Sequence, residues 1–242
     1  MNPRLKNAGI AGVLTGIALA GEFMFFMVSG YDPQSLNDPA AALAFLRDGG
    51  AYIKLAVLFG AAGVALRTIF VSGLAASLRS SAPTRATAVL YFGILGGAGH
   101  GLVALSFYLG IPMLVMLASG DPVAAAGTWG AFNIITSGFE GFGNFLLGLT
   151  LLLAGWVIVS HRALPTSSGW VGLLAGISTL FRVFTTGTPL AALGFVAFFP
   201  SLLFAGVFDI WAGIALWRND SSQSWRDMEG VQAHADWEIF NG

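Results

Sequence analysis

The stretch N-I-I-T-S-G-F-E-G-F-G-N-F-L-L-G, residues 133–148, indicates the class of fold for the whole chain. It lies inside a long apolar segment, yet Asn133, Ser137, Glu140 and Asn144 recur at steps of four, three and four. On an α-helix this spacing places the four polar side chains on one face. An ionisable residue such as Glu140 within a membrane-spanning helix is a candidate functional residue.

The composition indicates an all-α membrane protein. Of the 242 residues 56% are hydrophobic and only 10% are charged, and the mean hydropathy is +0.77, whereas soluble domains carry about 25% charged residues. A net charge of −1 without a basic patch argues against nucleic acid as a partner. The chain has no cysteine, which excludes disulfides, thiol catalysis and thiolate metal sites.

Apolar runs of about 20 residues predict a bundle of six transmembrane helices. The spans are expected at about 8–30, 51–79, 85–112, 133–160, 169–187 and 195–217, which gives a transmembrane domain of residues 1–218 and a polar cytoplasmic tail of residues 219–242. The first span resembles a signal peptide up to Ala20, but the apolar residues that continue to Val28 favour a true first helix.

The distribution of Lys and Arg predicts the orientation. One side of the predicted membrane domain holds seven of them, and the other side holds only Arg47 and Lys54. The seven are Arg4, Lys6, Arg79, Arg85, Arg162, Arg218 and Arg226. The positive-inside rule then places both termini in the cytoplasm.

Two external loops are predicted to carry short interfacial helices. In the first loop, Asn37 can cap a helix whose first turn holds Asp38 and Pro39. In the second loop, Pro112 is expected to end the third span and Asp121-Pro122 to begin a new helical segment. This segment is predicted to be another short helix or an extension of the fourth span.

Five ionisable residues lie within the spans, and the cost of a lone charge at mid-bilayer, about 2.5–3.5 kcal/mol, predicts that they pair inside the bundle. We expect Arg182 to pair with Glu140 or Glu22, and Arg67 with Asp209. The candidate buried polar residues are therefore Glu22, Arg67, Glu140, Asn144, Arg182 and Asp209. The favoured interpretation is a polar packing seam that sets the register of the helices; the alternative is an ion or proton path.

His100 lies in the glycine-lined segment G-G-A-G-H-G, where it could ligate a haem or a chlorophyll magnesium. A lone intramembrane histidine is more often a hydrogen-bonded packing residue, so that no cofactor other than lipid is predicted. No catalytic constellation and no metal motif appear, and a rhomboid-type serine protease is excluded because the sixth span has no histidine.

Small residues recur every four positions in several spans, as in Ser168, Gly172 and Gly176. Such stripes let helix backbones approach closely in lipid. Packing within the bundle is the favoured interpretation, and contact with a helix of another subunit is the alternative.

The second half of the chain resembles a family of uncharacterised bacterial six-helix membrane proteins, domain of unknown function 4386. The resemblance covers about residues 133–217. It rests on F-L-L-G-L-T-L-L-L-A-G-W-V-I-V-S (145–160), on Leu164-Pro165 in the following loop, and on G-W-V-G-L-L-A-G-I (169–177). It implies a six-helix architecture and a bacterial cytoplasmic (inner) membrane location, but no activity, cofactor or site residue.

The function expected from these features is that of a non-catalytic accessory or structural subunit. It would contact membrane lipids, and other membrane subunits through its small-residue helix faces and its tail. A small transporter or ion/proton pathway that uses the buried Glu, Arg and Asp residues is the alternative.

Overall fold

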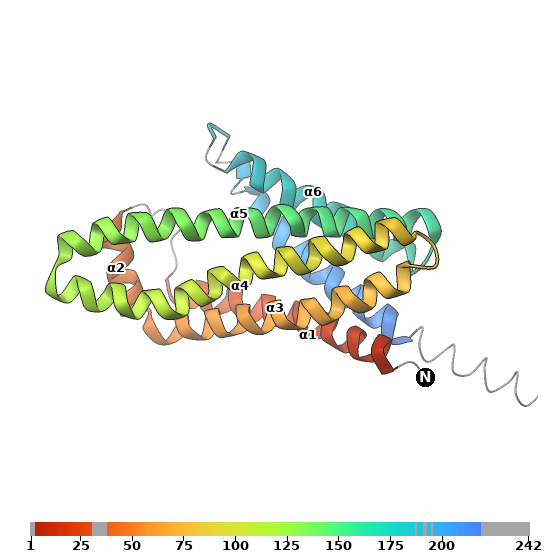
Figure 1. The fold of residues 1–242 in the computed structure, drawn as a ribbon, viewed down its shortest axis with the longest axis horizontal. Coiled ribbons are helices and arrows are strands. Elements are labelled where there is room, and N and C mark those ends of the chain that lie inside the picture. Colours follow the sequence, from red (N-terminus) through yellow and green to blue (C-terminus); the bar gives the residue numbers. More distant parts are fainter. Residues whose placement is uncertain (1–2, 31–37, 187, 191–192, 195, 219–242) are drawn as a thin grey trace, which may run out of the picture.

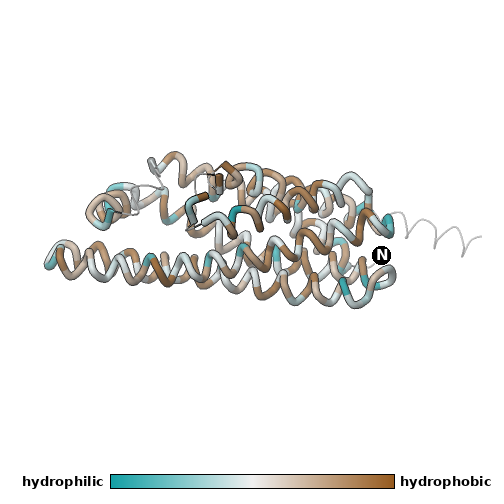
Figure 2. The backbone as a smooth tube through the Cα atoms, turned by 90° about the horizontal axis from the view of Figure 1, so that it is seen from above, coloured by the Kyte–Doolittle hydropathy of each residue, from teal (hydrophilic) through white to brown (hydrophobic). Residues whose placement is uncertain are grey.

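The computed structural model describes residues 3–30, 38–186, 188–190, 193–194 and 196–218. Within them the protein is entirely α-helical, and six helices are long and apolar enough to cross a membrane. The helices are α1 (Pro3–Val28), α2 (Pro39–Asp48), α3 (Gly50–Leu78), α4 (Pro83–Gly120), α5 (Pro122–His161), α6 (Thr166–Thr185) and the last described helix (Val196–Arg218). Apolar residues predominate along the long helices (Figure 2), and the prediction of an all-α protein with six spans is confirmed.

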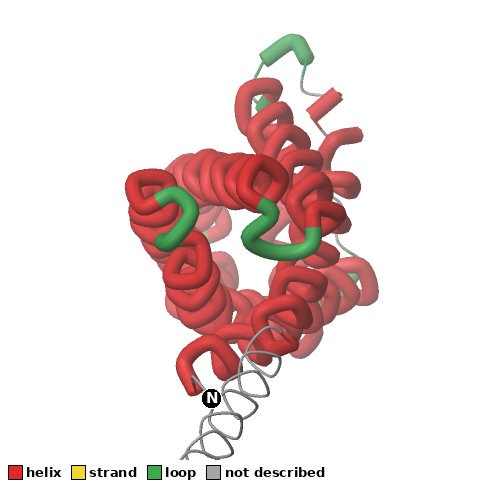
Figure 3. Tube along the Cα trace, turned by 90° about the vertical axis from the view of Figure 1, so that its right-hand side faces the viewer, coloured by secondary structure: helices red, strands yellow, loops and turns green. Residues whose placement is uncertain are grey.

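The six spans form a closed ring, because each one packs against the next along the chain and the last described helix packs against α1. Figure 1 shows the antiparallel neighbours from the side, and Figure 3 shows them end-on. Pro3, the loop at 79–82, the loop at 162–165 and Arg218 lie at one end of the ring, which we call the termini end. The opposite end, where α2 lies, is called the α2 end.

Glycines set the close approaches that shape the ring. A Cβ atom on Gly9 would lie 2.7 Å from the Gly213 carbonyl oxygen of the last described helix, and one on Gly155 of α5 would lie 2.6 Å from the Gly169 carbonyl oxygen of α6. No residue larger than glycine fits between backbones at these distances. The predicted small-residue stripes are therefore used for packing within the chain.

The α4–α5 hairpin is longer than predicted. Instead of stopping at Pro112, α4 continues to Gly120, and α5 begins at Pro122 rather than near residue 133. Pro112 removes one backbone hydrogen bond, but the helix on either side keeps its own, so that one proline does not end it. At 1.5 Å per residue the two helices are about 57 and 60 Å long, and they extend beyond the other spans at the α2 end (Figure 1).

Of the two external helices predicted, the first forms, and the second is present in the alternative form predicted for it, as an extension of the fourth span that begins at Pro122. α2 is capped by Asp38, whose carboxylate accepts a hydrogen bond from the backbone N–H of Ala40 at 3.0 Å. Asn37, the predicted cap, lies outside the described residues. Between residues 113 and 132 no separate helix exists, because α4 and α5 occupy the whole segment except Asp121, which caps α5. The predicted tail, 219–242, also lies outside the described residues.

The termini half of the ring is filled by a continuous apolar core. It brings together side chains of all six spans, and its largest fully buried members are Phe70, Phe208, Leu74, Leu78, Leu151, Ile158 and Leu216. The rings of Phe70 and Phe208 meet edge to face with their centroids 6.3 Å apart. A smaller core at the α2 end joins α2 to the hairpin through Leu43, Leu114 and Trp129. Polar side chains lie between these two cores.

Candidate functional site

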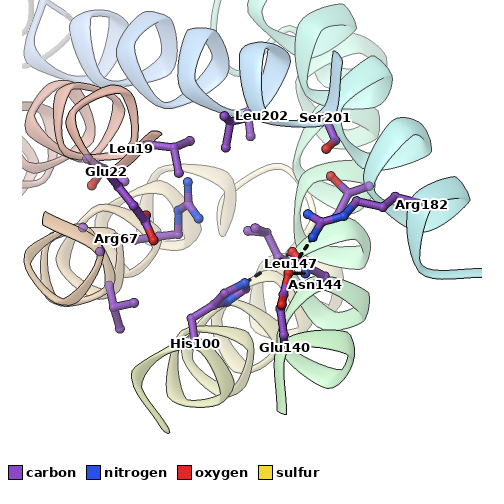
Figure 4. A pocket seen from close by; sticks show the side chains of 16 residues that line it. Leu19, Glu22, Arg67, His100, Glu140, Asn144, Leu147, Arg182, Ser201 and Leu202 are labelled. Carbon is purple, nitrogen blue, oxygen red and sulfur yellow. Dashed lines mark hydrogen bonds and ion pairs between the residues drawn. The ribbon is translucent and has the colours of Figure 1, made fainter. Parts of the chain in front are cut away.

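A cavity of about 150 Å³ lies on the axis of the ring, and every one of the six spans contributes to its wall. Its polar lining consists of Thr15 and Glu22 from α1, Arg67 from α3, His100 from α4, Glu140 and Asn144 from α5, Thr179 and Arg182 from α6, and Ser201 from the last described helix. Figure 4 shows the labelled members of this lining, from Glu22 and Arg67 on one side to Glu140 and Arg182 on the other, around one common space. The volume is large enough for several water molecules or a small polar group.

Arg67 lines the cavity and donates through Nη2 to Asp209 Oδ2, although Asp209 itself does not line it. We call these two residues the floor pair. Asp209 is 1% exposed. The Phe70–Phe208 contact is close to the pair along both helices, because Phe70 lies three residues after Arg67 and Phe208 lies directly before Asp209. Breaking such a pair leaves an uncompensated charge in an apolar core. Arg67 Nε has no hydrogen-bond partner, so that one donor of a residue that lines the cavity remains free among the described residues.

Glu140 and Arg182 form a second ion pair on the opposite wall. Arg182 Nη2 donates to Glu140 Oε1 at 2.5 Å, and the guanidinium carbon of Arg182 lies 4.6 Å from the centroid of the Phe198 ring. The side chains are 23% and 44% exposed for Arg182 and Glu140, far more than those of the floor pair. The carboxylate and the aromatic face together hold the arginine across α5, α6 and the last described helix.

A chain of polar contacts continues from Glu140 to α4. Asn144 Nδ2 lies 3.5 Å from Glu140 Oε1, Asn144 Oδ1 lies 3.3 Å from His100 Nε2, and His100 Nδ1 lies 3.0 Å from the Gly96 carbonyl oxygen. Because a carbonyl oxygen only accepts, Nδ1 carries a proton. If Asn144 Oδ1 faces His100, Nε2 must carry a second proton to donate to it. If the Asn144 amide is rotated by 180°, its Nδ2 donates to an unprotonated Nε2. The polar contacts therefore have two arrangements, which differ by one proton on His100.

Glu22 differs from the other acids because it forms no hydrogen bond or ion pair with any described residue. Its carboxylate lies against Gly60 of α3, where a Cβ atom would come within 2.8 Å of Glu22 Oε1. Glycine at position 60 therefore makes the space that the carboxylate occupies. The side chain lines the cavity on the wall opposite Arg182 (Figure 4).

A second, larger cavity of about 560 Å³ lies on the α2 side of the first, and Glu140 and Arg182 line both. We call it the vestibule. Six phenylalanines dominate its wall, namely Phe23, Phe26, Phe45, Phe107, Phe198 and Phe199. The Glu140–Arg182 pair thus stands at the boundary between an aromatic vestibule and a polar cavity.

The polar stripe of residues 133–148 forms one face, as its spacing predicts. Asn133 and Ser137 line the vestibule, Glu140 lines both cavities, and Asn144 lines the inner one. Glu140 and Asn144 also contact neighbouring helices, through Arg182 of α6 and His100 of α4. The interpretation of this stripe as a packing seam therefore stays a prediction. The pairings Arg67–Asp209 and Arg182–Glu140 are present as expected.

Several lining residues carry no signal in the sequence. Thr179 donates its hydroxyl to the Ala175 carbonyl oxygen within its own helix, and Ser201 donates to Phe198 in the same way. Such hydroxyls occur throughout membrane helices. The vestibule phenylalanines are equally undistinguished in sequence, because phenylalanine is also typical of lipid-facing positions.

His100 has little room for a tetrapyrrole. Both of its ring nitrogens face protein atoms, and Gly143 lies so close that a Cβ atom there would come within 2.8 Å of Nδ1. A haem or chlorophyll metal would have to displace Asn144 to reach Nε2. The described residues contain no group of three or more His, Asp or Glu side chains arranged to hold a metal ion.

A ring of six apolar spans around a polar cavity defines the class of this chain as a multi-pass integral membrane protein. Its residues 14–215 match the model of the family described as domain of unknown function (DUF4386), and the chain belongs to that family. The match includes the first three spans, well beyond the segment 133–217 on which the resemblance rests. Neither a curated protein nor a solved structure matches the chain.

Proposed function

We propose that the protein provides a pathway for a small solute, ion or proton through the membrane, with its entrance at the α2 end. The observation that carries this proposal is the convergence of polar side chains from all six spans on one central cavity. Ionisable residues in a membrane are costly and typically mark such pathways. The apolar core of the termini half fills the other end of the axis, so that the proposed pathway would be accessible from the α2 end only.

The alternative is an accessory subunit of a larger membrane assembly. Most glycine faces contact other helices of this chain, but Gly127, Gly130, Gly138 and Gly141 of α5 have nothing within 4 Å of an added Cβ atom. This face is where a helix of another subunit would approach most closely. Purification in a mild detergent followed by native mass analysis tests this alternative, and recovery of the chain alone would contradict it.

We propose further that the termini end faces the cytoplasm of a bacterial cell and that the protein lies in the inner membrane. The cations of the termini end, Arg4, Lys6, Arg79, Arg85, Arg162 and Arg218, support this orientation, since the α2 end carries only Arg47 and Lys54 among the described residues. The vestibule would then open toward the periplasm.

Single cysteines test the pathway and the orientation together, because the natural chain has no cysteine to give a background signal. Ser137→Cys places a thiol in the vestibule, Ser201→Cys in the inner cavity and Ser80→Cys in the loop at the termini end. Ser168→Cys is the matched control in the packed core, where Ser168 is 0% exposed. Serine and cysteine are close in size, so that packing is little changed.

We expect a small membrane-impermeant thiol reagent added to intact cells to label Ser137→Cys and Ser201→Cys, and to leave Ser80→Cys and Ser168→Cys unlabelled. After the cells are opened, Ser80→Cys should react as well. An unreactive Ser201→Cys would contradict the pathway, and labelling of Ser80→Cys in intact cells would reverse the orientation.

Transport itself is measured in proteoliposomes loaded with a pH-sensitive dye and driven by a potassium diffusion potential. Glu140→Gln removes the carboxylate that stands between the two cavities. If the protein conducts protons, the dye signal should be present with the natural chain and absent with this variant. A proton flux that is unchanged by Glu140→Gln would show that protons do not pass by way of the Glu140 carboxylate.

A further inference from the structure

The charges around the cavity do not balance. Two arginines, Arg67 and Arg182, are each paired with a carboxylate, Asp209 and Glu140. Glu22 is the third carboxylate and has no cationic partner at hydrogen-bonding distance among the described residues. With His100 neutral and all three carboxylates ionised, the two guanidiniums leave one negative charge without a partner, and that charge lies at Glu22. The ligand that best complements this cavity therefore carries one positive charge.

The vestibule that leads to Glu22 suits a cation with an apolar body. Its wall holds six phenylalanines, and its volume of about 560 Å³ lies within the range of about 300–1,000 Å³ that is typical for sites of drug-sized ligands. Aromatic faces attract cations through their quadrupole. One of these rings already does so, since the Arg182 guanidinium lies over Phe198 at 4.6 Å.

Glu22 lies next to Phe23 on α1, which connects the two parts of the site. The Phe23 ring contacts the rings of Phe198 and Phe199 in the vestibule, with centroids 6.4 and 5.7 Å away. Glu22 itself lines the inner cavity, against Gly60. A ligand whose charge lies near Glu22 can thus leave its apolar groups among the phenylalanines.

From these observations we infer that the solute is a monovalent organic cation with aromatic or bulky apolar groups, bound with its charge near Glu22 and its body in the vestibule. The inference rests on the proposed pathway and names its substrate class. Arg182, held by Glu140 and Phe198, occupies the boundary that such a ligand must pass. As the ligand enters, its positive charge competes with Arg182 for the Glu140 carboxylate and the Phe198 ring.

Two ions of the same shape and opposite charge provide the test. Equilibrium dialysis measures the binding of tetraphenylphosphonium and of tetraphenylborate to the purified full chain in lipid nanodiscs. Empty nanodiscs give the partitioning of each ion into lipid. The variant Glu22→Gln removes the unpaired charge, and Asp48→Asn is its matched control, since Asp48 is an exposed acid at the α2 end whose partner is Arg47.

We expect saturable binding of the cation and none of the anion. Glu22→Gln should weaken cation binding by roughly tenfold or more, because a desolvated charge contact is lost. Asp48→Asn should change it by less than about twofold, because an exposed ion pair contributes little. Size-exclusion chromatography shows whether each variant remains folded, and the cation–anion comparison on the natural chain needs no variant.

Saturable binding of tetraphenylborate, or cation binding that is equal in Glu22→Gln, would overturn the assignment of the substrate class. The same holds if neither ion binds above the level of empty nanodiscs. In each of these cases reaction of Ser201→Cys with the thiol reagent would still support the pathway, so that the two proposals fail separately.

Discussion

The two halves of the ring are built from the same kinds of helix but differ in what fills the space between them. In the termini half, glycines bring backbones into contact and phenylalanine and leucine side chains close the axis. In the α2 half the same helices are separated by two cavities and carry the paired and unpaired charges. The difference shows that contacts between backbones and a packed apolar core set the helix positions in the termini half, whereas cavities separate the same helices in the α2 half.

The ion pairs mark the boundary between these halves. Arg67–Asp209 has side chains 12% and 2% exposed and lies on the packed half, whereas the side chains of Arg182–Glu140 are 23% and 44% exposed and lie in the open half. Two pairs with the same chemistry should therefore respond differently to substitution, as the following experiments test.

The largest effect is expected at the floor of the cavity. Asp209→Ala leaves Arg67 without its partner in an apolar core and should destabilise the protein by about 3–5 kcal/mol. The double variant Arg67→Met, Asp209→Leu removes both charges and should recover most of this loss. Unfolding in a denaturing detergent, followed by circular dichroism, measures both. A single variant as stable as the natural chain would show that the pair does not hold the two halves together.

A smaller effect is expected where helices touch through glycine. Gly155→Ala introduces a Cβ atom 2.6 and 2.7 Å from backbone atoms of Gly169 and Leu173, and should cost about 1–3 kcal/mol because the helices must separate. Gly138→Ala on the same helix meets nothing within 4 Å and should stabilise the helix slightly, by less than about 1 kcal/mol. The same unfolding assay compares the two variants, and equal effects would show that the close approach at Gly155 does not stabilise the packing of α5 against α6.

The exposed pair should contribute still less to stability. Glu140→Gln, Arg182→Gln and the double variant should each change the free energy of unfolding by about 1 kcal/mol or less, because the pair faces a cavity. Instead, we expect Arg182→Gln to speed the labelling of Ser201→Cys, since the boundary between vestibule and cavity loses its bulky cation. Losses comparable to that of Asp209→Ala would place this pair in the packed core.

The smallest change is expected in the visible absorption spectrum. His100 is enclosed by Asn144, Gly96 and Gly143, so that the purified protein should be colourless, and His100→Gln should have the same spectrum. A visible band that disappears in His100→Gln would show that a tetrapyrrole displaces Asn144 in the native protein.

Much of this arrangement was predictable from local patterns. The spacing of Asn133, Ser137, Glu140 and Asn144 predicts their common face, and the cost of lone charges in lipid predicts the pairing of Arg67 and Arg182 with acids. The length of the α4–α5 hairpin was not predictable from Pro112, because whether a proline ends a helix depends on the packing around it. The cap of α2 is Asp38, which the sequence alone did not single out because Asn and Asp side chains can accept the same backbone hydrogen bonds.

By itself the sequence determined that this protein is a six-span membrane bundle, because hydropathy, span length and helical periodicity are local properties of the chain. It also determined which residues are too costly to face lipid. Only the tertiary structure decided that most of these residues surround a cavity, that Glu22 has no hydrogen-bonding partner within the described part of the chain, and that phenylalanines from four helices share one vestibule. Those features depend on distances between helices far apart in sequence, which are set by where glycine permits contact and where larger side chains hold the helices apart.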